Sequence, residues 1–309
     1  MNTLQAPSSV VMIRPHQFRS NPETSGDNAF QTLPNRSLND TSKTALAEFD
    51  GATKALRSAG VIVHVFDDTG TETPDSVFPN NWFSTHVGGH IALYPMSAPN
   101  RRKERRSDVI EMLKQKYRVQ DVIDYSGLEH DNLSLEGTGA MVLDHIGRIA
   151  YTAKSNRADP VLLERFCTHF NYEPIVFEAK DSNGNDIYHT NVLMGIATEF
   201  ALICLDMIVD PARRATIVQR LEESGREVID LTADQISSFA GNAMELNGHQ
   251  RHLALSARAL DALTPSQIAT IERSATPLPL TIPTIETAGG SVRCMLAGIH
   301  LNARERIIQ

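Results

Sequence analysis

The sequence has 309 residues, of which 41% are hydrophobic and 21% are charged, and this length corresponds to about two domains of ordinary size. Its 29 basic and 37 acidic residues give a net charge of −8, which is the wrong sign for a protein that mainly binds nucleic acid or an anionic membrane. A small-molecule ligand therefore fits the composition better.

Three cysteines are too few for a disulfide framework, and no two of them have the spacing of a metal knuckle, so we expect a reducing compartment. The first nine residues lack the cationic and apolar parts of a signal peptide. The most apolar stretch, Phe200–Val209, is much shorter than the roughly 20 residues that cross a bilayer. These features predict a cytoplasmic protein without a membrane segment, and they leave open whether it forms a homo-oligomer.

The predicted elements begin with an incomplete unit: a strand at Val10–Arg14, a helix near Ser42–Ser58 and a strand at Val61–Phe66. From residue 77 onward the order strand, strand, helix, strand occurs four times. The first two copies are predicted at Trp82–His86, His90–Met96, Ser107–Tyr117 and Val119–Tyr125, and at Ala140–Leu143, Arg148–Ala153, a helix from Asp159 and Pro174–Phe177. The other two are predicted at Asn191–Ile196, Phe200–Ile208, a helix from Asp210 and Glu227–Leu231, and at Ala243–Leu246, His252–Leu255, a helix from Thr264 and Leu280–Ile285. The segment Ser291–Leu301 is predicted to supply the strand that the first unit lacks, which would close a ring.

A polar residue stands near the start of the first hairpin strand of each unit: Asn80, Glu136, His189, Asn242 and Cys294, separated by 56, 53, 53 and 52 residues. Equivalent positions in a ring of units would converge on one axis. Recurrent turn chemistry is the simpler explanation, and it accounts well for the asparagines. It does not explain why a Glu, a His and a Cys each occupy this position once.

Cys, His and a carboxylate at one place are the parts of thiol nucleophilic catalysis. Cys167 falls on the apolar face of a predicted helix and Cys204 in an apolar strand, so both are expected to be inert core thiols. Cys294 follows two glycines and has Arg293 beside it, a setting that favours the thiolate. His189 gains support from its place in the period and from Asn191, which would point to the same face of a strand.

Two other groups of polar residues are given simpler explanations. His86 and His90 are separated by a Gly-Gly hairpin turn, which argues against a zinc-binding helix. The basic run Arg101–Arg106 is expected to be a solvated stretch that leads into a helix. No metal site and no cofactor motif is predicted.

Four motifs resemble the guanidine-modifying (pentein) superfamily: Pro74–Phe78, Glu136-Gly137, His189–Asn191 and Gly289–Met295. The resemblance covers nearly the whole chain and implies a five-bladed α/β propeller of ββαβ units, which agrees with the ring. It implies that Cys294 is the nucleophile, His189 the general acid and base, and Glu136 its partner at the substrate nitrogens. We predict one catalytic domain at residues 8–303, with tails at 1–7 and 304–309.

The sequence departs from relatives that bind a cationic guanidinium at two positions, where Asn81 and Asn191 replace the usual aspartates. A guanidinium supplies only donors, whereas the neutral ureido group of citrulline has a carbonyl oxygen that needs a donor. Amides can donate to that oxygen and can stabilise the oxyanion that thiol attack creates. Asn81 and Asn191 are therefore predicted to bind the ureido group of a small amino-acid substrate, and Asn242 is predicted as a further substrate-binding residue.

The N-terminal strings Met12–Pro15, Asn21–Thr24 and Asn28–Gln31 look most like the citrulline-utilisation hydrolases, formerly grouped with amidinotransferases, although turn chemistry alone would also account for them. Further contacts with the substrate are predicted for four residues: Arg14 or Arg19 at the α-carboxylate, Asp75 at the α-ammonium, and Arg293 beside the nucleophile. Polar loops at 67–76 and 178–187 are candidate lids.

The leading hypothesis is a cofactor-free hydrolase that converts L-citrulline to ornithine, carbon dioxide and ammonia. Two alternatives stay open. One is an arginine deiminase or an amidinotransferase with the same fold and thiol, and the other is a non-catalytic module that binds citrulline or arginine.

Overall fold

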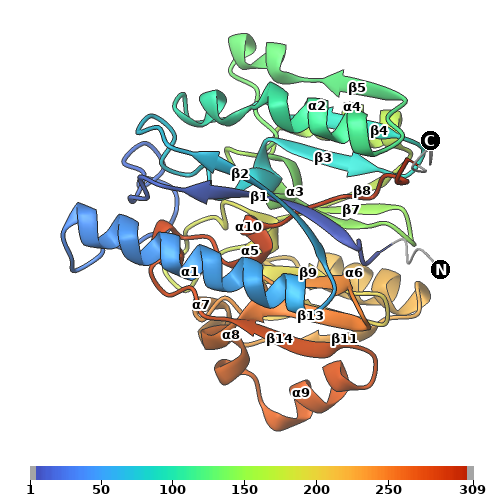
Figure 1. The fold of residues 1–309 in the computed structure, drawn as a ribbon. Helices are drawn as coiled ribbons and strands as arrows, with labels where there is room; N and C mark the ends of the chain where they lie inside the picture. Colours follow the sequence, from blue (N-terminus) through green and yellow to red (C-terminus); the bar gives the residue numbers. More distant parts are fainter. Residues whose placement is uncertain (1–4, 305–309) are drawn as a thin grey trace.

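The protein, described by a computed structural model over residues 5–304, contains five small sheets of three strands each within that range (Figure 1). In spatial order the first two sheets are β15(Ala297–Gly298)-β1(Ser9–Pro15)-β2(Ile62–Asp68) and β3(Phe83–His86)-β4(His90–Leu93)-β5(Asp121–Asp124). The next two are β6(Met141–Asp144)-β7(Ile149–Ala153)-β8(Glu173–Phe177) and β9(Met194–Ile196)-β10(Phe200–Ile203)-β11(Glu227–Asp230). The last is β12(Met244–Asn247)-β13(Arg251–Ser256)-β14(Thr276–Leu280). Five such sheets fit the predicted pseudo-fivefold repeat, and closure into a complete ring stays a prediction.

Each sheet has the same pairing pattern: the middle strand runs antiparallel to one neighbour and parallel to the other. A parallel pair needs a crossover, and a helix supplies it in every unit. The crossover helices are α1(Leu38–Ser58), α2(Ser107–Lys116), α4(Pro160–Phe170), α6(Pro211–Glu223) and α9(Pro265–Glu272), with α8(Ala257–Ala262) ahead of α9 in the last unit. The predicted order strand, strand, helix, strand is therefore confirmed.

The predicted helix starts are confirmed by their capping contacts. The Asp159 carboxylate accepts the Val161 and Leu162 N–H groups at 2.9 and 3.2 Å, and Asp210 caps α6 in the same way. Thr264 and Gln267 form a reciprocal capping box at α9. Apolar side chains of α4 such as Phe166 are buried between the helix and its sheet, so the hydrophobic cores lie there and the polar turns are left for the centre.

Two predicted strands near the C-terminus are wrong in position. The last strand of the fifth unit is β14(Thr276–Leu280) rather than Leu280–Ile285, and Ile285 lies in the 3₁₀ helix η5(Ile285–Ala288). The two prolines of β14, Pro277 and Pro279, are tolerated because β14 is an edge strand. Within Ser291–Leu301 the structure has a helical turn, α10(Val292–Met295), and only then the short β15, which pairs antiparallel with β1. The two ends of the chain still meet in the first sheet, as predicted.

The recurrent polar positions lie ahead of the first strands rather than on them. Asn242 lies in a loop before β12, and the other four lie on or directly before short helical turns. These turns are η1(Pro79–Asn81), α3(Gly137–Ala140), α5(Thr190–Leu193) and α10. Glu136 and His189 are the residues that directly precede α3 and α5. Asn191 lies in α5, so the prediction that it points to the same face of a strand as His189 is wrong. The predicted convergence of the polar residues is nevertheless real. The strand predicted at Phe200–Ile208 likewise ends at Ile203, where η4(Leu205–Met207) follows Cys204.

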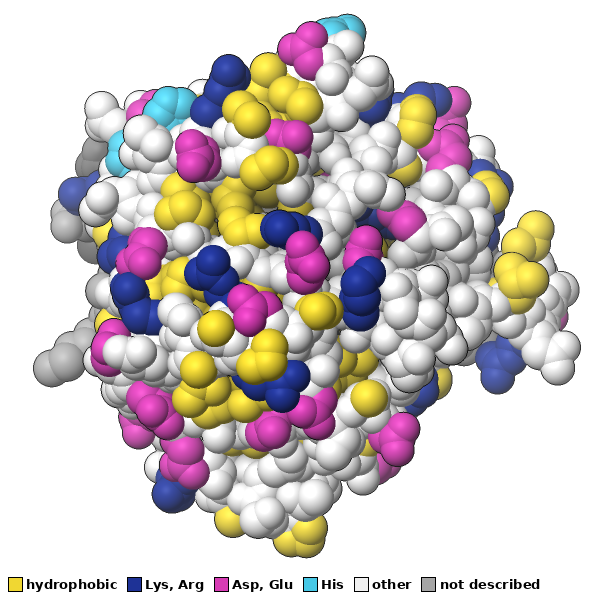
Figure 2. Space-filling model, turned by 180° about the vertical axis from the view of Figure 1, so that it is seen from behind, with side chains coloured by type: hydrophobic (Ala, Val, Ile, Leu, Met, Phe, Trp, Pro, Cys, Tyr) yellow, Lys and Arg dark blue, Asp and Glu magenta, His cyan; other side chains and the backbone are white. Residues whose placement is uncertain are grey.

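The predicted tails fall partly outside the structure, since residues 1–4 and 305–309 are not among those described. Gln5 is buried and donates hydrogen bonds to the Leu143 and Ile196 carbonyls, so residues 5–7 pack against the fold instead of forming a tail. The single domain at 8–303 stays a prediction. Among residues 5–304, no helix is long and apolar enough to cross a bilayer. On the face shown in Figure 2, basic and acidic side chains are intermixed with apolar ones.

Candidate active site

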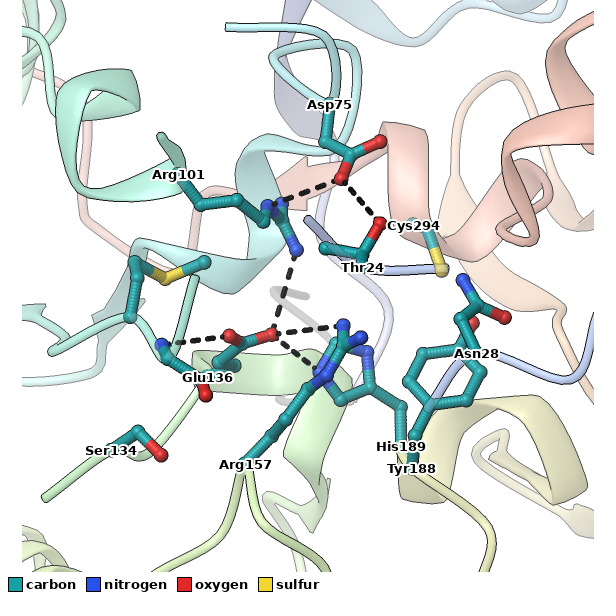
Figure 3. A network of polar contacts seen from close by, with 12 residues as sticks. Thr24, Asn28, Asp75, Arg101, Ser134, Glu136, Arg157, Tyr188, His189 and Cys294 are labelled. Carbon is teal, nitrogen blue, oxygen red and sulfur yellow. Dashed lines mark hydrogen bonds and ion pairs between the residues drawn. The ribbon is translucent and has the colours of Figure 1, made fainter. Parts of the chain in front are cut away.

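The short turns bring side chains from different units to one narrow cavity. Its lining combines the predicted residues Asp75, Asn81, His189 and Cys294 with others that were not predicted, which are Asn28, Phe78, Arg101, Arg157 and Tyr188 together with backbone at Ala288 and Gly290. Figure 3 shows Cys294, His189 and the two arginines directed toward the same space, with Glu136 joined to both arginines and to His189. The convergence predicted from the 52- to 56-residue period is therefore present in the structure.

The thiol of Cys294 is buried and accepts two amide hydrogen bonds. Asn191 Nδ2 lies 3.3 Å from Sγ and Asn242 Nδ2 lies 3.2 Å from it. The Oδ1 atoms of both asparagines are buried and have no hydrogen-bond partner. Two amide donors thus contact the sulfur, and neither carries a charge.

Two glycines permit the close packing of this site. A Cβ at Gly139 would lie 2.1 Å from the Asn81 amide and 2.8 Å from His189 Nδ1, so no side chain fits there. Gly289 has a φ of +84° and lies against the amide of Asn28, which makes glycine the residue suited to this turn before the nucleophile.

His189 and Glu136 form a buried hydrogen-bonded pair in which Nε2 lies 2.8 Å from Oε2. Because a carboxylate only accepts, Nε2 donates and Nδ1 is left as the acceptor. Burial lowers the pKa of the His189 imidazole to about 4, and Glu136 opposes this only in part. Burial acts to raise the pKa of Glu136, but Arg157, the His189 hydrogen bond and Arg101 outweigh it and hold that pKa well below its ordinary value. The pair is thus a neutral imidazole oriented by a carboxylate.

Arg101 is a fully buried cation surrounded by carboxylates. Its Nε and Nη2 donate to the two oxygens of Glu104 at 2.9 and 3.0 Å, Asp75 Oδ2 lies 3.7 Å from Nε, and Glu136 Oε2 lies 3.5 Å from Nη1. Burial acts to lower the pKa of Arg101, but Glu104, Asp75 and Glu136 raise it above the ordinary value. The prediction that Arg101–Arg106 is a solvated run is wrong at Arg101, because these buried carboxylates outweigh the cost of burying the cation.

Arg157 is the second buried cation of the cavity. Its Nη1 lies 3.5 Å from Glu136 Oε2, its Nε donates to Asp27 Oδ2 at 2.9 Å, and its Nη2 donates to Asp27 Oδ1. Its guanidinium also lies over the Tyr188 ring, 4.8 Å from the centroid. Sequence reasoning missed Arg157, which stands alone between a strand and a helix with no motif around it.

Asp75 and Asn81 close the cavity on the side of η1. Asp75 Oδ2 accepts a hydrogen bond from Asn21 at 2.7 Å, whereas its Oδ1 is buried without a partner. Burial raises the pKa of Asp75, although Arg101 acts in the opposite direction. In the orientation that satisfies the Asn81 amide, its oxygen accepts from both Nη atoms of Arg101 at 3.1 Å and its nitrogen donates to Asn80 at 3.2 Å.

Three arginines that were predicted to bind substrate do not lie on this cavity. Arg14 is partly exposed and pairs with Asp50 and Asp67, since surface carboxylates stand beside it. Arg19 donates to the Thr71 carbonyl at 2.7 Å. Arg293 points to a separate cavity beyond the nucleophile and donates to the Leu296 carbonyl at 2.9 Å.

Cys167 and Cys204 are buried free thiols, as predicted. Within residues 5–304 no cluster of three or more His, Cys, Asp or Glu side chains could hold a metal ion. Whether the loops 67–76 and 178–187 move stays untested. The first supplies Asp75 to the cavity, and the residue after the second, Tyr188, donates from its hydroxyl to the Gly289 carbonyl at 2.5 Å.

Comparison with family models gives one match, over residues 14–301, to a family described as N,N dimethylarginine dimethylhydrolase, eukaryotic. The chain belongs to this family. It is therefore a pentein, a member of the guanidine-modifying superfamily that the four motifs resemble. A comparison with curated protein sequences gave no match.

Solved pentein structures share the fold at low sequence identity. The N-terminal domain of ArgZ, described as an arginine dihydrolase from the ornithine-ammonia cycle in cyanobacteria, matches with a TM-score of 0.73 and 14% identity over 94% of this chain and 97% of that chain. AgrE in complex with ornithine and NAD⁺ matches with a TM-score of 0.73 and 17% identity, over 96% of this chain and 40% of that chain. A dimethylarginine dimethylaminohydrolase adduct matches with a TM-score of 0.65 and 12% identity, over 95% and 100%. At these identities the likeness shows the fold alone.

Proposed function

We propose that this pentein is a cysteine-dependent hydrolase that acts on the ureido carbon of L-citrulline. The observation that carries the proposal is the pair of amide donors, Asn191 Nδ2 and Asn242 Nδ2, within 3.3 Å of the Cys294 sulfur. The carbon that the sulfur attacks would lie beside these donors, and so would the oxygen on that carbon. Preorganised donors at the site of developing negative charge typically contribute a few kcal/mol to transition-state stabilisation, about 3 each.

The opposite end of the cavity suits the head group of an α-amino acid. Arg101 and Arg157 present guanidinium groups, which pair well with a carboxylate, and Asp75 Oδ1 is a buried acceptor with no partner. An ammonium group donated to Asp75 would satisfy this oxygen. The α-carboxylate is therefore assigned to the arginines, and the α-ammonium to Asp75 as predicted.

The chemistry follows from these positions. The Cys294 thiolate attacks the ureido carbon, and His189, which carries the proton taken from the thiol, delivers it to the departing nitrogen as ornithine leaves. The enzyme is left as an S-carbamoyl thioester. A water molecule, deprotonated at His189, then releases carbamate and restores the thiol, and the carbamate decomposes to ammonia and carbon dioxide. Glu136 keeps the imidazole oriented through both proton transfers.

Hydrolysis of a guanidinium substrate is the second candidate, for two reasons. The matched family is described as a dimethylarginine hydrolase. In addition, the buried ions around the cavity include three carboxylates, Asp75, Glu104 and Glu136, but only two arginines, Arg101 and Arg157. These carboxylates, however, lie against Arg101, whereas the groups that contact the sulfur are amides. Neutral groups at the reacting end favour a neutral ureido group.

A substrate panel tests the proposal. L-citrulline, L-arginine and methylated arginines are each incubated with the protein, and ornithine, citrulline and ammonia are measured. The expected result is ornithine and ammonia from citrulline, with turnover lost by at least about 10³-fold in Cys294→Ala and kept in the matched Cys204→Ala. Citrulline formed from arginine would instead establish the second candidate, and citrulline binding without any product would indicate a binding module.

A further inference from the structure

Residues 16–36, between β1 and α1, contain no helix or strand and lie against the cavity; this segment is called the strap. Its side chains contact the cavity walls at four points: Asn21 with Asp75, Glu23 with the Asn100 N–H, Asp27 with Arg157, and Asn28 with the Ala288 carbonyl. In Figure 3, Thr24 and Asn28 of the strap stand beside Asp75 and Cys294. A substrate that reaches the sulfur therefore meets the strap.

The contact between Asp27 and Arg157 occupies the part of Arg157 that a substrate carboxylate would use. A guanidinium binds a carboxylate best through two parallel N–H groups, and the Nε and Nη2 groups of Arg157 both donate to Asp27. The remaining nitrogen, Nη1, faces Glu136, which is fully buried and holds His189. An α-carboxylate that binds Arg157 through two hydrogen bonds must therefore take the place of Asp27.

The corresponding contact of Arg101 has different surroundings. The side chains of Arg101 and Glu104 are 2% and 0% exposed, so displacing Glu104 would leave a buried carboxylate unpaired, a costly change. Arg157 is 3% exposed, but Asp27 is 35% exposed and can move into water. Exchange of one carboxylate for another is thus feasible at Arg157 and unfavourable at Arg101.

We propose that Asp27 is a specificity-determining residue that occupies the carboxylate position of the cavity, so that a ligand binds Arg157 only if its own carboxylate displaces Asp27. This inference rests on the proposed function in so far as the ligand is an α-amino acid. It holds equally for citrulline and for arginine. The expected consequence is that Asp27 lowers the affinity for α-amino acids, whose carboxylate must displace it from Arg157, and does not affect amines that lack the carboxylate, because these bind with the ion pair in place.

Binding measurements test this without any turnover. In the Cys294→Ala protein, calorimetry compares L-citrulline and L-arginine with N-carbamoylputrescine and agmatine, which lack only the carboxylate. Asp27→Asn should bind the two amino acids more tightly, by roughly fivefold, the effect of removing one partly exposed competing ion pair, and should bind the two amines with unchanged affinity. Asp27→Ala should behave in the same way.

Glu23→Gln is the matched control, because it removes another strap carboxylate that contacts the wall without touching Arg157. It should not change the ratio of amino-acid to amine affinity. Weaker or unchanged amino-acid binding in Asp27→Asn, or an equal gain for the amines, would overturn the inference. The predicted pattern with arginine, in a protein that does not hydrolyse citrulline, would overturn the proposed function alone.

Discussion

The two ends of the cavity are built from different kinds of side chain. Around the Cys294 sulfur the polar contacts come from the neutral amides of Asn191 and Asn242. Around Arg101, which also lines the cavity, the contacts come from buried carboxylates that include Glu104 and Asp75. Charge is thus concentrated around the arginines, where the head group of an amino acid would bind, and the side chains that contact the sulfur directly are neutral.

This difference shows why the net charge of −8 says little about the substrate. An ionic end can recognise the carboxylate and ammonium of any α-amino acid, so it does not distinguish citrulline from arginine. The neutral end can distinguish them, because a carboxylate beside the sulfur would favour a guanidinium and repel an oxyanion. Selectivity for the reacting group is therefore assigned to amides, and selectivity for the amino-acid class to ions.

The largest effect is expected for Glu136, which connects the two ends. Glu136→Gln should lower kcat by about 10²- to 10⁴-fold, because His189 loses the carboxylate that orients and stabilises it. Steady-state kinetics measure this, with circular dichroism to confirm folding. Glu129→Gln is the control. Glu129 also pairs with an arginine of the Arg101–Arg106 run, but this arginine, Arg105, does not line the cavity. Equal losses in both variants would contradict a role for Glu136 in the reaction.

A charge introduced at the neutral end should reverse the selectivity. Asn191→Asp replaces an amide donor by a carboxylate next to the sulfur, so citrulline turnover should fall by about 10²- to 10³-fold. Binding of arginine should become tighter at the same time, since the new carboxylate can pair with its guanidinium. Parallel kinetics and calorimetry with both amino acids decide this. Unaltered citrulline kinetics would refute the assignment of selectivity to the amides.

Weakening the ionic end should affect binding more than chemistry. Arg101→Lys keeps the charge but loses the planar fork, so KM should rise about tenfold while kcat changes less. Arg105→Lys, which alters the same kind of bidentate pair outside the cavity, should leave KM unchanged. A loss confined to kcat would place Arg101 at the reacting end instead.

The smallest effect is expected from mild acid. With the pKa of His189 lowered to about 4 by burial, the imidazole stays neutral from pH 7 to pH 5, and only about a tenth of it is protonated at pH 5. The value of kcat/KM should therefore change less than about twofold over this range on account of His189, and should fall as the pH approaches 4. A profile that already falls near pH 6.5 would show an imidazole with an ordinary pKa.

Much of the candidate site could be predicted because it repeats with the fold. Glu136, His189 and Cys294 stand at similar places in three of the five units, so a period of 52 to 56 residues brings them together whatever the details of each strand. Errors arose where several local structures satisfied the same pattern. Ser291–Leu301 has the apolar content of a strand, yet its first half contains the helical turn that carries Cys294.

The partners of the arginines could not be predicted in this way. Arg101 lies in a basic run that resembles a solvated surface. Its burial is made favourable by the nearby Glu104 together with Asp75 and Glu136, which come from distant parts of the chain. Arg157 and Asp27 are 130 residues apart, and no local pattern connects them.

By itself the sequence determined the repeating unit, the membership in the pentein superfamily and the choice of Cys294 as the candidate nucleophile, because these depend on local periodicity and on short motifs. The tertiary structure alone decided which arginines face the cavity, that Asp27 forms an ion pair with one of them, Arg157, and that two amides contact the sulfur. The physical reason is that the free energy of a buried charge depends on all its neighbours, and those neighbours are set by folding rather than by sequence order.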